Sequence, residues 1–66
     1  MENNIVNTLI NLTNRTNDDI KIAAINALGE YKAAIGHKTA IERLLLLCKD
    51  PNKNIAISAI NSISKL

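Results

Sequence analysis

Few side chains in this 66-residue sequence could do chemistry, and they stand apart from one another. His37 is the only histidine and has no cysteine near it with which to hold a metal ion. Cys48 falls on an apolar helical stripe, where a buried thiol is structural rather than nucleophilic. Asp18 and Asp19 are adjacent, but carboxylates at a helix start are explained by the helix dipole. The sequence therefore predicts no enzyme, no metal site and no cofactor.

The composition argues against several further classes. Lys and Arg number 8 against 6 Asp and Glu, a net charge of +2, and the lysines are scattered, whereas a nucleic-acid-binding domain shows a clustered basic face. One cysteine forms no internal disulfide, and no apolar run is long enough for a membrane span. No phosphate-binding motif indicates a small-molecule substrate. Without a basic and then apolar leader after Met1, the expected location is the cytoplasm.

The elements that must position any site are four helices. Apolar residues recur at helical spacing over residues 2–13, 17–35, 38–49 and 51–66, and no two-residue alternation indicates a strand. Gly29, inside the second segment, indicates a close neighbour or a bend. The predicted core stripes are Ile5, Val6, Leu9, Ile10 and Leu12, then Ile20, Ala23, Ala24, Ala27, Leu28 and Tyr31, then Ala40, Ile41, Leu44, Leu45, Leu47 and Cys48, and finally Ile55, Ala59, Ser62, Ile63 and Leu66.

Polar residues mark the ends of these helices. Asn3 or Asn4 can cap the first helix and Asn17 the second, which should end near Ile35 because Gly36 favours a stop. Asp50 should cap the fourth helix with Pro51 at its first position.

The chain resembles itself at a shift of 35 residues. Because a repeated helical pair cannot bury its apolar stripe alone, the two copies should stack within a single domain over residues 1–66, with repeat 1 at 1–35 and repeat 2 at 36–66. The identical pairs are Leu9/Leu44, Leu12/Leu47, Asn17/Asn52, Ile20/Ile55, Ile22/Ile57, Ala24/Ala59, Ile25/Ile60 and Asn26/Asn61.

The run from Asp19 to Gly29 resembles the second-helix signature of HEAT-like repeats. It has an Asp in the turn, an aliphatic-basic pair, two Ala, and then Ala-Leu-Gly. The resemblance implies an all-α, four-helix α-solenoid segment of two stacked HEAT-like helical hairpins. The second copy departs from the signature, so the ladder from turn acid to basic residue that often links such repeats is not expected. The departures are Asn54, Ala56, Ser58, Ser62 and Ser64.

Because second helices line the concave surface of HEAT-like arrays, the resemblance implies a paired strip there. Ile22 and Ile57, flanked by Asn26 and Asn61, would form a small apolar groove for a peptide or a partner helix. The alternative is that these isoleucines only pack one unit on the next. Leu46 lies off its core stripe and is a further candidate contact.

The predicted function is a non-catalytic protein-interaction or scaffold module. Two units are fewer than α-solenoids usually have, which favours self-association or docking on a larger protein. Two alternatives stay open: a nucleic-acid-binding module, for which Lys21 is the only basic residue on the expected concave face, and an accessory subunit or fragment of a larger enzyme or complex.

Overall fold

The computed structural model describes residues 4–66 as four α-helices and one short 3₁₀ helix. No strand occurs within these residues, and the all-α class is confirmed. The elements are α1 (Asn4–Leu12), α2 (Asp18–Glu30), the 3₁₀ helix η1 (Lys32–Gly36), α3 (Lys38–Leu47) and α4 (Lys53–Lys65).

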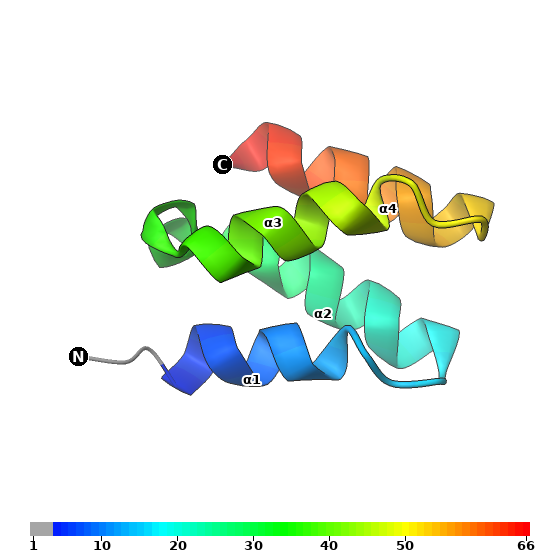
Figure 1. Ribbon diagram of the computed structural model, residues 1–66, viewed down its shortest axis with the longest axis horizontal. Coiled ribbons are helices and arrows are strands. Elements are labelled where there is room, and N and C mark those ends of the chain that lie inside the picture. Colours follow the sequence, from blue (N-terminus) through cyan, green and yellow to red (C-terminus); the bar gives the residue numbers. More distant parts are fainter. Residues whose placement is uncertain (1–3) are drawn as a thin grey trace.

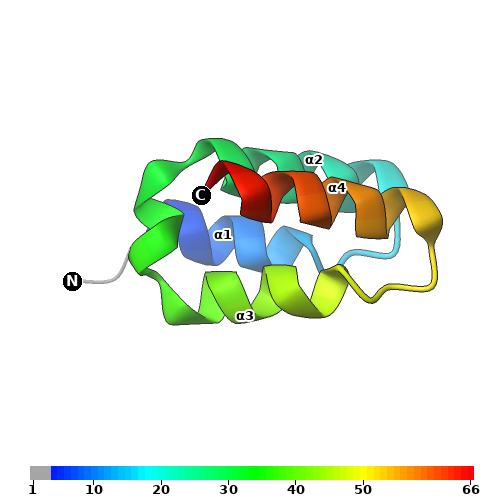
Figure 2. The ribbon, with the colours of Figure 1, turned by 90° about the horizontal axis from the view of Figure 1, so that it is seen from above.

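The helices form two stacked hairpins, which we call unit 1 (α1 and α2) and unit 2 (α3 and α4) (Figure 1). Helices α2 and α4 run side by side in one layer and α1 and α3 lie in the other (Figure 2), and α2 makes its most extensive helix contact with α4. The two loops within the hairpins lie at one end of the molecule, and η1 lies at the other. The predicted boundary after residue 35 falls inside η1.

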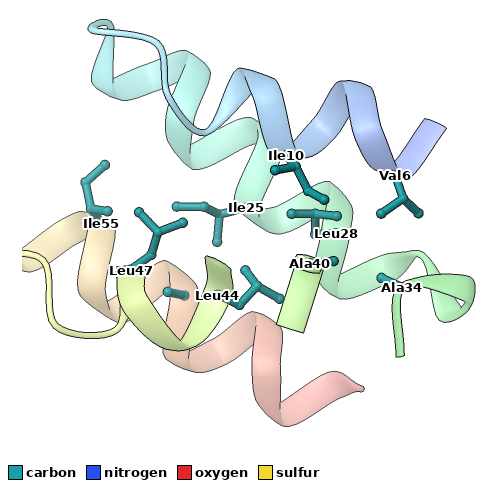
Figure 3. Close-up of a cluster of buried hydrophobic side chains, with 10 residues drawn as sticks. Val6, Ile10, Ile25, Leu28, Ala34, Ala40, Leu44, Leu47 and Ile55 are labelled. Atoms are coloured by element: carbon teal, nitrogen blue, oxygen red, sulfur yellow. The ribbon is translucent and has the colours of Figure 1, made fainter. Parts of the chain in front are cut away.

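The core is aliphatic and receives side chains from every helix (Figure 3). Its largest fully buried side chains include Val6, Ile25, Leu28, Leu44 and Ile55. Tyr31, the only aromatic residue, is partly buried and packs against this core from its edge. Most of the predicted stripes point inward as expected.

Three stripe assignments are wrong, because Ile5, Ala23 and Leu45 were expected in the core but are exposed. Ile25, which the predicted stripe does not include, is fully buried. The spacing of apolar residues predicts which side of a helix is apolar. It does not predict which edge of that side packs against a neighbouring helix. Here the helices of unit 1 are buried on the flank toward unit 2, and the helices of unit 2 on the flank toward unit 1.

The cap at Asn17 is confirmed, because its side chain accepts a hydrogen bond from the backbone N–H of Ile20 at 3.1 Å. The prediction that Asp50 caps α4 is wrong. Its carboxylate accepts from the N–H of Asn52 at 2.8 Å, and Asn52 caps α4 instead. Pro51 therefore precedes the helix, and helices α2 and α4 both begin directly after an asparagine cap.

Three other helix ends also differ from the prediction. Helix α2 ends at Glu30 rather than near Ile35, because Tyr31 is extended and the chain turns into η1, which buries Ala34 in the core. Helix α1 ends at Leu12, and α3 ends at Leu47. Asn4 is already helical, and the alternative cap Asn3 lies outside the described residues.

Candidate functional site

The predicted strip on α2 and α4 is packed against the core at one isoleucine and exposed to solvent at the other. Ile22 is partly buried and packs against the core, whereas its counterpart Ile57 is 45% exposed. Asn26 and Asn61 are both exposed. Ile22 therefore contributes to the stacking of the two units, and the equivalent flank of α4, which carries Ile57, faces solvent.

Polar contacts between the units fix the position of α4 along α2. Lys65 Nζ lies 3.0 Å from Glu30 Oε1, and Asn52 Nδ2 donates to Asp18 Oδ2 at 3.0 Å. Positions 34 or 35 apart in the sequence thus lie at about the same level along α2 and α4. Asp18, the residue before the signature's Asp19, thus binds an amide of unit 2.

The two units approach each other closely at Gly29. A Cβ added to Gly29 would lie 2.7 Å from the Cα of Ser62, and the Ser62 hydroxyl donates to the carbonyl of Ile25 at 2.7 Å. The close neighbour that the sequence indicated at Gly29 is α4, and the small serine of unit 2 makes that contact possible.

Arg43 is a structural residue that the sequence did not reveal. From α3 its guanidinium donates to Thr13 Oγ1 at 2.9 Å, to Thr13 O at 3.2 Å and to the side chain of Asn14. Its counterpart in unit 1 is Thr8, so comparison of the two repeats carried no signal for this contact. Arg43 ties the end of α1 to the second unit.

The contact between the units has two different sides. The helices of unit 1 contribute one flank to this contact. The equivalent helices of unit 2 contribute their other flank, because the two units stack in the same orientation. We call this contact the internal interface. Its unit 1 side includes Val6, Ile10, Thr13, Ile22, Ile25 and Gly29, and its unit 2 side includes Ala40, Arg43, Leu44, Leu47, Ile55 and Ser62.

The residues of unit 2 that correspond to the unit 1 side of this interface lie mostly in solvent: four are exposed, and Ile41 and Cys48 are partly buried. The counterparts of the unit 1 side, each 35 residues later in the sequence, form what we call the C-terminal end face. They are Ile41, Leu45, Cys48, Ile57, Ile60 and Ser64. Leu45 and Ile60 are each 51% exposed and Ile57 is 45% exposed, whereas their counterparts Ile10 and Ile25 are buried.

The unit 2 side of the interface also has counterparts on unit 1, of which Ile5 and Thr8 are exposed and the others are partly buried. These counterparts, which we call the N-terminal end face, are Ile5, Thr8, Leu9, Leu12, Ile20 and Ala27. Ile5 is 57% exposed, and Asn4, Ile5, Thr8 and Leu9 line a hollow on α1. Both ends of the stack thus carry the kind of apolar surface that is buried between the units.

Leu46 lies apart from these faces. It is 59% exposed and sits on α3 one turn after the exposed Glu42. Because consecutive helical residues point about 100° apart, Leu46 faces a different direction from its neighbour Leu45.

The side chains that could do chemistry have structural roles or stand alone. His37 Nδ1 accepts from the N–H of Ala40 at 3.3 Å and caps α3, and Cys48 is partly buried against the core. Among residues 4–66, no group of three or more His, Cys, Asp or Glu side chains could hold a metal ion. None of the helices over that range is both long and apolar enough to cross a membrane.

Comparison with known proteins gives a single family. The family model described as HEAT repeats matches residues 6–66, which include every helix except the start of α1. No curated protein and no solved structure matches the chain.

Proposed function

The chain belongs to the family of HEAT repeats, and on that basis we propose that it is a non-catalytic protein-interaction module that self-associates through its end faces. HEAT repeats generally mediate protein–protein interactions or scaffolding and are typically non-catalytic. The proposal adds to this general role a specific partner, a second copy of the chain, and a specific surface.

The observation that carries the proposal is the exposure of Leu45, Ile57 and Ile60 on one end face, at 51%, 45% and 51%. Burying a large aliphatic side chain fully contributes about 1.5–3 kcal/mol. Association costs about 4–15 kcal/mol in lost freedom of motion, which these half-exposed side chains offset only in part. Because a contact also buries apolar side chains of the second copy, we expect it to be weak, reversible and concentration-dependent.

The predicted strip adjoins this face. Ile57 belongs to the C-terminal end face, while Asn26 and Asn61 form exposed amides on the neighbouring surface of α2 and α4. We therefore propose the end face as the binding surface, with the asparagines at its margin.

The charges give less support to nucleic-acid binding. Lys65 is paired with Glu30, and Lys32 Nζ donates to the carbonyl of Lys65 at 2.9 Å. Asp19 and Glu30 are exposed on α2, the helix that carries Lys21. Acidic and basic groups alternate on this surface, whereas phosphate binding needs a clustered basic face.

Two adjacent leucines provide a matched test. Leu45 and Leu46 are exposed to a similar degree, at 51% and 59%, but only Leu45 belongs to the end face. The Leu45→Asp and Leu46→Asp variants would be compared with the unchanged chain by size-exclusion chromatography with light scattering. Circular dichroism would verify that both variants remain helical.

The unchanged chain and Leu46→Asp should associate as the concentration rises, and Leu45→Asp should stay a monomer, because a buried, unpaired carboxylate opposes association. Equal association by all three proteins would contradict the proposed surface. Loss of association in Leu46→Asp alone would assign binding to the outer side of α3 instead.

A further inference from the structure

We propose that the chain assembles head to tail, with the C-terminal end face of one copy docking on the N-terminal end face of the next. This inference rests on the proposed function and specifies how the copies are arranged. It follows from the internal interface, which already shows the same two kinds of surface in contact within one chain.

The two end faces are counterparts of the two sides of a contact that the chain makes internally. Positions 35 residues apart take the same place in their units, as the parallel helices α2 and α4 and their asparagine caps demonstrate. A second copy placed on the first as unit 2 is placed on unit 1 would bring these faces together. Each copy would then continue the stack.

The positions of apolar side chains on the two faces agree with this placement. Within the chain, Ile10 packs in one cluster with Ala40 and Leu44. In the contact between copies, Leu45 of one copy takes the place of Ile10. Ile5 and Leu9 of the next copy take the places of Ala40 and Leu44. Ile5 and Leu9 line the hollow on α1, and Leu45 is the exposed side chain that this placement directs toward that hollow.

The charges also agree. Within the chain, Lys65 of unit 2 pairs with Glu30 of unit 1 at 3.0 Å. Lys65 and Glu30 are themselves counterparts, so the same placement sets Lys65 of one copy beside Glu30 of the next. Opposite charges would meet again and extend the pair into an alternating row along the stack.

Two differences make the contact between copies weaker than the internal one. In the contact between copies, Ser64 takes the place of Gly29, and Ala27 takes the place of Ser62. Because Ser64 has a side chain where Gly29 has none, α4 of one copy cannot approach α2 of the next as closely. Thr8 takes the place of Arg43, which removes the guanidinium hydrogen bonds to the neighbouring unit. The assembly should therefore dissociate on dilution while each chain remains folded.

A two-fold dimer is less consistent with these surfaces. Such a dimer pairs identical patches, so it would cover one end face and leave the other open. Head-to-tail stacking covers both faces and, because the contact does not pair a surface with itself, it extends into an open chain of copies.

Mixing two blocked variants tests this arrangement. Ile5→Asp blocks the N-terminal end face and Ile60→Asp blocks the C-terminal one, and both side chains are more than half exposed, at 57% and 51%. Each variant alone should be a monomer. Their mixture should form dimers of twice the 7.2 kDa chain mass in native mass spectrometry, since each variant keeps the face that the other lacks.

The control is a mixture of Ile57→Asp with Ile60→Asp, which lack the same face and should stay monomeric. A monomeric Ile5→Asp/Ile60→Asp mixture, with the unchanged chain associating, would overturn the head-to-tail arrangement and leave self-association standing. Association of Ile5→Asp alone into dimers would indicate a two-fold contact between C-terminal end faces. A monomeric unchanged chain would overturn both this inference and the proposed self-association.

Discussion

Gly29 sets the distance between the two units. Its missing side chain lets α4 approach until Ser62 lies where a Cβ would be, and the Ser62 hydroxyl then reaches the carbonyl of Ile25. A glycine within a helix costs about 1 kcal/mol relative to alanine. The close packing and the buried hydrogen bond offset this loss.

Replacing Gly29 with alanine should therefore destabilise the protein despite the gain in helix propensity. The added methyl group would lie 2.7 Å from backbone, so α2 and α4 must separate, at a cost of about 1–3 kcal/mol. Urea unfolding followed by circular dichroism would measure the free energy of unfolding.

Gly36→Ala is the matched control, because a Cβ at Gly36 meets nothing within 4 Å and its φ is not positive. This change should be neutral or stabilising by up to about 1 kcal/mol. Equal effects of the two substitutions would contradict the role assigned to Gly29.

At the scale of the elements, Arg43 joins α3 to the end of α1. Helices α1 and α3 share few direct contacts compared with α2 and α4, so a polar link is important here. The guanidinium bonds both the side chain and the carbonyl of Thr13, a buried residue whose hydroxyl also donates to the carbonyl of Ile10. One planar side chain thus satisfies acceptors at the end of α1.

Arg43→Lys should lower the free energy of unfolding by about 1–2 kcal/mol, because a single ammonium cannot reproduce the planar set of donors. Thermal and urea denaturation would measure the loss. Arg15→Lys, at an exposed position in the loop after α1, should change stability by less than about 0.5 kcal/mol. A neutral Arg43→Lys variant would show that the link does not hold the units together.

The sequence predicted the helices better than their ends and flanks. Spacing of Ile, Leu and Ala was sufficient for four helices, and the shift of 35 residues predicted two similar hairpins. It could not predict that α2 ends at Glu30, because burial of Ala34 by η1 depends on tertiary packing.

The sequence alone could not show which flank of each helix is buried. Ile25 and Ile60 are identical counterparts, so one stacking direction must bury the first and expose the second. The sequence alone does not contain that direction, which depends on how the units stack. This is why Ile60 and Leu45 were missed as candidate binding residues while Ile57 was included.

At the scale of the whole molecule, the two ends of the stack dominate the exposed apolar surface. A chain of this size buries only about 60% of the surface that it exposes when unfolded, so stability is marginal. Self-association would bury the end faces as well and should raise the unfolding temperature with concentration, because a contact made only by the folded state stabilises it.

Sedimentation equilibrium of the unchanged 66-residue chain over a wide concentration range tests the proposed self-association most directly. We predict a weight-average mass that starts near 7.2 kDa and rises steadily past the dimer, as expected for an open head-to-tail stack. A mass that stays at 7.2 kDa at every concentration would contradict the account.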